Sequence, residues 1–183
     1  MNDHKGFFAM MARMKYIERW ALMRNSVSEN ICEHSLEVAM LAHGLGIIGR
    51  KRFGKDLSPE RLAMLGMYHD CTEIITGDMP TPVKYANDEL KEAYKAIEDS
   101  AAQRLLEMLP EDLRAEYESY FLPEQITPEE YRYVKAADKL SALIKCIEEE
   151  KTGNQEFRSA KQATYESLQQ MNMPEVTVFC EAF

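Results

Sequence analysis

What the sequence has little of narrows the possible classes of protein. Its 183 residues include 22 lysines and arginines against 31 acidic residues, which gives a net charge of −9. A chain of that sign repels the phosphate backbone of DNA and RNA, so we expect no nucleic-acid polymer as a partner. A small anionic substrate remains compatible with this charge if a few cations are placed close to it.

Cysteine is also scarce, and no long apolar run is present. The four cysteines lie far apart and form no CxxC pair, which is typical of reduced thiols in a cytosolic protein. The first twenty residues have scattered charges instead of the layout of a signal peptide. The longest apolar stretch, VAMLAHGLGIIG, is too short to span a bilayer. We therefore predict a cytoplasmic protein without a membrane partner.

Strand-like alternation is missing as well, and so are repeats and linkers. Apolar residues instead recur at intervals of three and four, which indicates helices. The segment 32–50 is apolar on all sides, which predicts a central helix. Residues 19–30 and 76–83 are predicted loops. We expect an all-α single domain over residues 1–183. Its expected helices cover about 7–17, 32–50, 59–75, 87–108, 110–121, 128–151 and 155–171.

Four polar residues are expected on the buried sides of three of these helices. His34, His69 and Asp138 share helix faces with apolar residues, and Asp70 follows His69 directly. A carboxylate on such a face is costly unless it is paired or bound to a cation. Two imidazoles and two carboxylates could converge on one divalent metal ion with coordination positions left open.

Each of these residues also has an ordinary structural interpretation. A single inward histidine is more often a hydrogen-bonded core residue, and a single inward aspartate is often a cap or an ion-pair partner. The ordered set of His34, the His69-Asp70 pair and Asp138 is harder to explain in that way. His43 cannot join the set, because it lies nine residues after His34 and therefore about 180° around the helix.

The same residues lie in stretches that resemble a known family. "RWALMRN", "MLGMYHDCTEIITGDMPTPVKY" and "VKAADKLSALIKCIEE" are similar to the HD-domain metal-dependent phosphohydrolases, and within them to the bacterial 5'-deoxynucleotidases of the YfbR type. The resemblance covers nearly the whole chain. It implies an HD-domain helical bundle with a buried metal site, and hydrolysis of 2'-deoxyribonucleoside 5'-monophosphates to deoxyribonucleoside and phosphate. It also implies a homodimer.

The resemblance assigns roles to individual residues. Its one divalent cation could be Co, Mn, Zn, Ni or Mg, because two histidines and two carboxylates suit several ions. The implied catalytic residues are Glu73 and Arg19: a carboxylate can transfer a proton as acid or base, and a guanidinium can grip phosphate. The implied metal ligands are His34, His69, Asp70 and Asp138. The implied substrate-binding residues are Arg19, Trp20, His34, Asp70, Asp78, Met79, Pro80, Thr81 and Asp138.

Several alternatives stay open at this point. Arg19 could be a solvated arginine, Trp20 a core or interface anchor, and Glu73 a surface glutamate in an ion pair. The segment 78–81 could be a simple turn stiffened by proline. The protein could also act on another nucleotide phosphate, or be a non-catalytic nucleotide-binding HD module. The presence of Glu73 beside all four ligands favours an enzyme.

Overall fold

A computed structural model describes residues 6–84 and 86–183, which divide into two compact units. The first unit comprises residues 6–22, 28–33, 68–84 and 86–126, and the second comprises 23–27, 34–67 and 127–183. The described residues form helices and turns without a strand; Glu18 and Asn30 make an isolated antiparallel bridge. The all-α prediction is therefore confirmed, whereas one domain over 1–183 stays a prediction.

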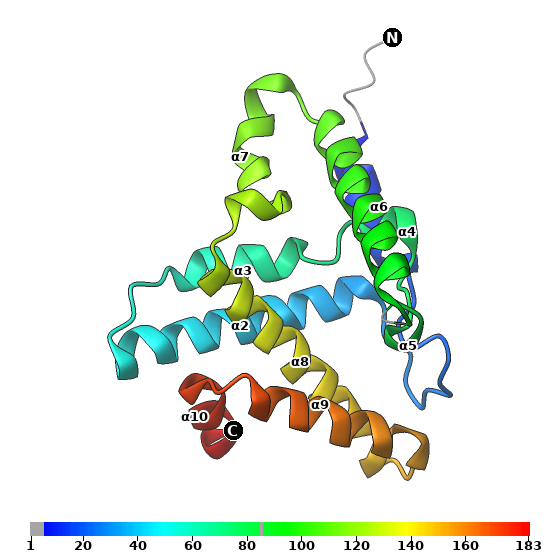
Figure 1. Cartoon of the computed structure of the whole chain (residues 1–183), viewed down its shortest axis with the longest axis vertical. Helices are drawn as coiled ribbons and strands as arrows, with labels where there is room; N and C mark the ends of the chain where they lie inside the picture. Colours follow the sequence, from blue (N-terminus) through cyan, green and yellow to red (C-terminus); the bar gives the residue numbers. More distant parts are fainter. Residues whose placement is uncertain (1–5, 85) are drawn as a thin grey trace. The chain divides into compact units, whose positions relative to one another are not determined.

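The first unit is built around a cluster of apolar side chains from its helices and the turn after Tyr68. The predicted helix 7–17 is divided, because Ile17 N–H bonds to Met14 O and the second half tightens into a 3-10 helix. The helices of this unit, of which α4, α5, α6 and α7 are labelled in Figure 1, are α1 (Phe7–Met11), η1 (Ala12–Tyr16), α4 (Glu73–Thr76), α5 (Thr81–Lys84), α6 (Asp88–Glu107), α7 (Glu111–Phe121) and η2 (Pro123–Gln125).

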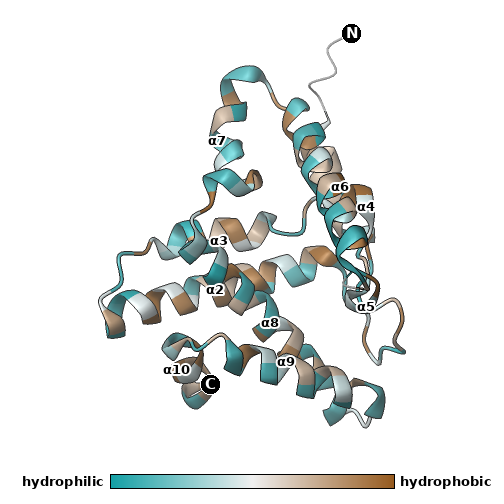
Figure 2. Cartoon of the chain, in the orientation of Figure 1, coloured by the Kyte–Doolittle hydropathy of each residue, from teal (hydrophilic) through white to brown (hydrophobic). Residues whose placement is uncertain are grey.

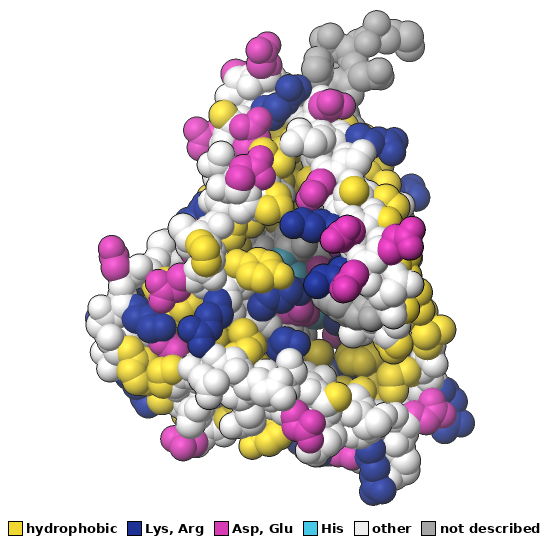
Figure 3. Space-filling model, viewed as in Figure 1, with side chains coloured by type: hydrophobic (Ala, Val, Ile, Leu, Met, Phe, Trp, Pro, Cys, Tyr) yellow, Lys and Arg dark blue, Asp and Glu magenta, His cyan; other side chains and the backbone are white. Residues whose placement is uncertain are grey.

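The long helix α6 begins and ends where the sequence predicts. The side chain of Asn87 accepts a hydrogen bond from Leu90 N–H at 2.7 Å, which caps the first turn. After α6, Pro110 is the cap residue of α7, whose first turn contains Glu111 and Asp112. Acidic side chains gather over α7 in the space-filling view (Figure 3). Glu111 and Asp112, in the first turn, stabilise the positive N-terminal end of the helix dipole.

The second unit contains the longest helices. α8 begins with a complete capping box, in which Thr127 Oγ accepts from Glu130 N–H and the Glu130 side chain accepts from Thr127 N–H. The C-terminal segment after residue 171, for which no helix was expected, is helical. The helices of this unit are α2 (Ile31–Phe53), whose first three residues belong to the first unit, α3 (Pro59–Tyr68), whose last residue does too, α8 (Pro128–Lys151), η3 (Gln155–Phe157), α9 (Arg158–Gln170) and α10 (Pro174–Ala182).

The prediction that α2 is apolar all round and central is only half right. Val38 and Leu45 are fully buried, but Leu36 and Met40 are 55% and 61% exposed. Hydrophobic and hydrophilic segments alternate along α2 in Figure 2. By length and composition alone this helix could cross a membrane, a test that the half-buried core helix of a soluble protein also passes.

The predicted helix 59–75 is wrong at its C-terminal end. α3 ends at Tyr68, and the next helix, α4, begins at Glu73. Between them, Cys71 N–H bonds to Tyr68 O at 3.1 Å and Glu73 N–H to Asp70 O at 3.0 Å, so the backbone turns with i to i+3 bonds. The predicted loop 76–83 also contains α5, which accommodates Pro82 in its first turn.

Candidate functional site

His34 and Asp138 form an imidazole–carboxylate pair in the second unit. His34 comes from the first turn of α2 and is fully buried, and Asp138 comes from the middle of α8. His34 Nε2 lies 3.3 Å from Asp138 Oδ1, and Lys135 Nζ donates to the other carboxylate oxygen at 3.2 Å. The prediction that His34 points into the core is confirmed, and Asp138, with a 22% exposed side chain, is half-buried.

The other ring nitrogen of His34 is held by a short chain of hydrogen bonds. The Ser141 hydroxyl donates to Glu37 Oε2, and its oxygen lies 3.0 Å from His34 Nδ1. A serine hydroxyl has one proton, so Ser141 Oγ must accept from Nδ1–H. The neutral ring then has its lone pair on Nε2, the atom that faces Asp138. This is how a protein prepares a histidine as a metal ligand.

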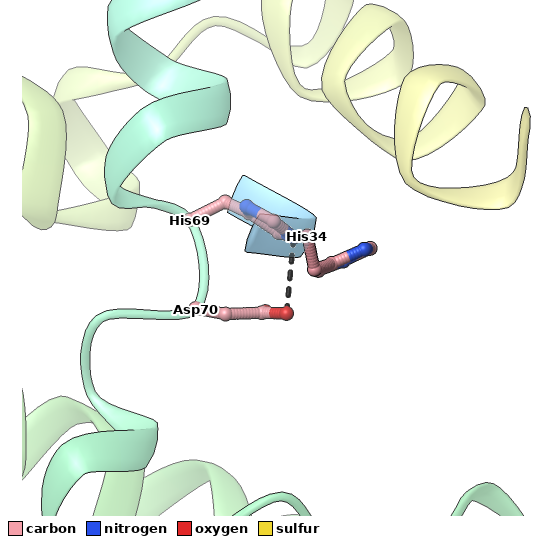
Figure 4. A group of neighbouring side chains, drawn as sticks. All are labelled: His34, His69 and Asp70. Carbon is pink, nitrogen blue, oxygen red and sulfur yellow. Dashed lines mark ion pairs between the residues drawn. The ribbon is translucent and has the colours of Figure 1, made fainter. Parts of the chain in front are cut away.

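His69 and Asp70 form a second imidazole–carboxylate pair, in the first unit. Both belong to the turn between α3 and α4, so the tight turn and not a helix face positions them. His69 Nε2 lies 3.1 Å from Asp70 Oδ2, the contact marked by the dashed line in Figure 4. Their side chains are 9% and 19% exposed. Asp70 Oδ2 also lies 3.5 Å from Arg19 Nη1.

The donor chemistry of the two pairs fits a divalent transition metal. Each pair directs an imidazole nitrogen and a carboxylate oxygen toward one another, and these donors bind the same first-row ions. In His34, the hydrogen bond to Ser141 keeps the proton on Nδ1. The lone pair is then on Nε2, the nitrogen that faces Asp138. The residues that the sequence predicted as ligands therefore suit a metal in type and in local geometry.

Arg19 and Trp20 lie in the first unit and share one carboxylate. Glu29 Oε2 accepts a hydrogen bond from Arg19 Nε at 3.0 Å and another from Trp20 Nε1 at 2.8 Å. The backbone of Trp20 has a φ of 61°, in the left-handed region that tryptophan rarely adopts. Arg19 is not the solvated arginine of the ordinary interpretation, because its side chain is only 12% exposed.

Glu73 is the most strongly perturbed carboxyl near these residues. It is 6% exposed, and its Oε2 makes no hydrogen bond within residues 6–84 and 86–183. Burial first, and then the negative charges of Asp70 and Asp78, raise the pKa of Glu73 to about 10 against the opposing effect of Arg19. The alternative of a surface glutamate in an ion pair is therefore wrong. A protonated carboxyl at neutral pH is suited to give a proton.

The remaining predicted residues lie in the segment after α4. Asp78, Met79 and Pro80 are partly buried in the non-helical stretch after Gly77, and Thr81 is exposed at the start of α5. Lys84, at the end of α5, donates to Glu98 at 2.8 Å. Asp78 acts on this site through its charge, which helps to raise the pKa of Glu73.

Sequence reasoning missed three residues that hold the predicted ones. Ser141 and Glu37 orient His34, and Glu29 orients Arg19 and Trp20. Ser141 lies one turn after Asp138, so a search for hydrogen-bonding side chains beside the ligands could have found it. Glu29 gave no such signal, because it lies in an irregular polar loop whose pairing with residues 17–19 only the fold reveals.

Comparison with known proteins identifies the family. The family model described as "5'-deoxynucleotidase YfbR-like" matches residues 6–183. A 5'-deoxynucleotidase of Vibrio atlanticus is 49% identical over 97% of this chain and 91% of its own length. The 5'-deoxynucleotidase YfbR of Shigella boydii is 46% identical over 97% of this chain and 89% of its own length.

Solved structures show that the fold is shared more widely. An HD-domain phosphohydrolase of Listeria innocua has a TM-score of 0.84 at 23% identity, covering 97% of this chain and 85% of that chain. The cyanophage S-2L HD phosphohydrolase DatZ, bound to dA and one catalytic Zn²⁺ ion, has a TM-score of 0.66 at 21% identity, covering 94% and 93%. The chain belongs to the YfbR-like family of 5'-deoxynucleotidases, which are phosphoric monoester hydrolases.

Proposed function

We propose that this protein hydrolyses 2'-deoxyribonucleoside 5'-monophosphates to deoxyribonucleoside and phosphate, with one divalent cation held by His34, His69, Asp70 and Asp138. The observation that carries the proposal is the presence of two imidazole–carboxylate pairs, at 3.3 and 3.1 Å, in a chain of this family. The imidazole nitrogens and carboxylate oxygens of these residues are donors that suit a divalent first-row ion. The dA and catalytic Zn²⁺ ion bound to DatZ agree with both the substrate class and the metal class.

The substrate phosphate is expected to bind Arg19, next to Asp70. A bound cation would neutralise part of the phosphate charge and lower the pKa of a water molecule. The Arg19 guanidinium, whose Nη1 lies 3.5 Å from Asp70 Oδ2, supplies the planar donors that suit phosphate oxygens. His34, Asp70 and Asp138 then contact the substrate as well as the metal.

Glu73 is the proposed proton carrier. Because burial raises its pKa to about 10, the metal-free protein holds this carboxyl in its protonated form at neutral pH. In that form it can give a proton to the leaving 5'-oxygen of the nucleoside. A cation bound close by would lower the pKa of Glu73, which brings it nearer to the working pH that general acid–base catalysis needs.

The nucleoside is expected to lie against Trp20 and the segment from Asp78 to Thr81. A tight wall formed by the indole of Trp20 would reject the additional 2'-hydroxyl of a ribonucleotide. Asp78 is the proposed acceptor for the 3'-hydroxyl, while Met79, Pro80 and Thr81 line the same segment. The partial burial of residues 78–80 supports a segment that is held in place.

A metal-exchange assay tests the proposed function. The protein is stripped with a chelator, loaded separately with Mg, Mn, Co, Ni or Zn, and mixed with nucleoside mono-, di- and triphosphates of both sugars. We expect phosphate release that depends on the metal and is fastest from deoxynucleoside 5'-monophosphates. Release mainly from triphosphates would identify another HD phosphohydrolase, and nucleotide binding without release would identify a binding module.

Two further properties are proposed. The family resemblance implies a homodimer, and the composition of the sequence predicts a cytoplasmic location with neither a membrane nor a nucleic-acid polymer as a partner. The net charge of −9 agrees with the last point. Light scattering of the purified protein gives its mass in solution, and a mass of one chain at micromolar concentration would contradict the homodimer.

A further inference from the structure

Glu29, in the polar loop before α2, makes three hydrogen bonds to two neighbouring residues of the proposed site. Its backbone carbonyl accepts from Arg19 N–H at 2.8 Å. Its side-chain Oε2 accepts from Arg19 Nε at 3.0 Å and from Trp20 Nε1 at 2.8 Å. The side chains of Arg19 and Glu29 are only 12% and 14% exposed. Shielding from water makes this contact stronger than an ion pair on an open surface.

The contact with Glu29 determines which way the guanidinium of Arg19 points. Glu29 Oε2 accepts from Arg19 Nε, the guanidinium nitrogen next to the aliphatic part of the side chain. The terminal Nη1 is at the other end of the guanidinium plane, 3.5 Å from Asp70 Oδ2. Because a guanidinium is planar and rigid, holding Nε also fixes the direction of the terminal nitrogens. Glu29 therefore aims Arg19 at the carboxylate beside which the phosphate is proposed to bind.

Trp20 depends on the same carboxylate for its orientation. Its φ of 61° is a conformation that a bulky residue adopts only when its surroundings hold it. The bridge between Glu18 and Asn30 holds the backbone on one side, and the bond from the indole to Glu29 holds the side chain. The Arg19 guanidinium lies 6.0 Å from the centre of the indole ring. One oxygen atom thus links the orientations of both side chains.

We propose that Glu29 is a positioning residue that couples phosphate binding by Arg19 to sugar selection by Trp20. This inference rests on the proposed function, because it assumes that Arg19 and Trp20 contact the nucleotide. It assigns no contact between Glu29 and the substrate. Without the carboxylate, both side chains lose the acceptor that they share, so affinity for the phosphate and discrimination between the two sugars change together.

Fluorescence of the protein without substrate tests the structural half of the inference. Trp20 is the one tryptophan of the chain, so its emission reports on this position alone. Glu29→Ala is expected to shift the emission maximum and to increase quenching by acrylamide, because the indole loses its acceptor and becomes mobile. Glu18→Ala is the matched control: it removes an exposed carboxylate from the same backbone bridge and should leave both quantities at the parent values.

Kinetics tests the functional half. Glu29→Ala is expected to raise the KM for deoxynucleoside monophosphates about 10- to 100-fold, the range for loss of charge-assisted hydrogen bonds, with a smaller change in kcat. The ratio of kcat/KM for deoxynucleotides to that for ribonucleotides should fall, as it is expected to do in Trp20→Ala. Glu29→Gln keeps an acceptor oxygen without the charge, so it should lie between the parent and Glu29→Ala.

Each outcome decides between a positioning role and a purely structural one. The inference is overturned if Glu29→Ala has a lower Tm but keeps the parent's emission and the parent's ratio of kcat/KM between deoxy- and ribonucleotides. If Glu29→Ala does not fold, the same comparison is made with Glu29→Gln. A parent protein that releases no phosphate from any deoxynucleotide contradicts the proposed function instead. In that case the fluorescence comparison, which needs no substrate, still decides whether Glu29 holds Trp20.

Discussion

At the scale of single residues, Glu73 has the surroundings of a reactive group. A buried carboxyl whose Oε2 makes no hydrogen bond in the described part of the chain costs the fold free energy. The family resemblance assigned Glu73 a role beside His69 and Asp70. The helix expected over residues 59–75 was wrong there, since His69 and Asp70 lie in a turn and Glu73 begins α4.

Glu73→Gln tests the proton-carrying role. Glutamine keeps the size of the side chain but cannot transfer a proton at neutral pH, so kcat should fall by about 10² to 10⁴. The variant should fold, bind deoxynucleotide and contain as much metal as the parent by elemental analysis. A nearly normal kcat would remove Glu73 from the reaction, and loss of metal in parallel with activity would make it a ligand.

Ser141→Ala tests whether the hydrogen-bond chain from Glu37 prepares His34 for a metal. Without the hydroxyl, the His34 ring loses the acceptor that holds its proton on Nδ1. Metal affinity, measured by competition with a coloured chelator, should fall about 10- to 100-fold. The control is Ser35→Ala, a buried serine beside His34 whose hydroxyl makes no hydrogen bond within the described residues. Equal affinities of the two variants would contradict the role of Ser141.

At the scale of elements, helix starts were predicted more accurately than helix ends. The Thr127-Pro128 start of α8 and the Asn87 start of α6 follow from local side-chain hydrogen bonds that the sequence displays. The end of α3 at Tyr68 has no glycine or proline to mark it. The i to i+3 bonds that turn the chain there depend on packing within the fold, which periodicity does not report.

The packing of α3 on α2 can be tested with two glycines. A Cβ at Gly66 would lie 3.0 Å from the Cα and N of Ala39, and these backbone atoms cannot move aside easily. Gly66→Ala should therefore lower the free energy of unfolding by about 1 to 3 kcal/mol. At Gly44, within α2, no described atom lies within 4 Å of an added Cβ. Gly44→Ala should raise stability by about 0.5 to 1 kcal/mol, since alanine favours helix. Thermal unfolding compares them, and equal changes would contradict this packing.

At the scale of the whole molecule, one buried glutamate joins distant parts of the chain in the second unit. Glu149 accepts from Lys145 Nζ at 2.6 Å, from Asn154 Nδ2 at 2.8 Å and from Ser26 N–H at 2.8 Å, 123 positions away. Burial alone would raise the pKa of Glu149, but these hydrogen bonds outweigh it and hold the pKa well below the usual range. Only Lys145, one turn earlier on α8, could be paired with Glu149 from the sequence, because Ser26 and Asn154 lie in loops that the fold brings to it.

Acid unfolding tests the Glu149 anchor. A carboxyl with a lowered folded pKa contributes stability above its ordinary pKa of 4.5, and this contribution is lost as pH falls below that value. Glu149→Gln should cost about 3 kcal/mol at pH 7, since Lys145 keeps a buried charge. Its Tm should then depend less on pH below about 4.5 than that of the parent. The control Glu150→Gln, which removes partly exposed ion pairs to Lys161 and Arg158, should keep the parent's steep acid limb.

The central claim is that one metal ion, bound by His34, His69, Asp70 and Asp138, enables this protein to release phosphate from deoxynucleoside monophosphates. The most direct test measures metal content and phosphate release together in Asp138→Ala, with His43→Ala as the control on the other side of α2. The account predicts that Asp138→Ala loses both the metal and the activity, while His43→Ala keeps both at the parent level. Full metal content and full activity in a folded Asp138→Ala protein would contradict the four-ligand site.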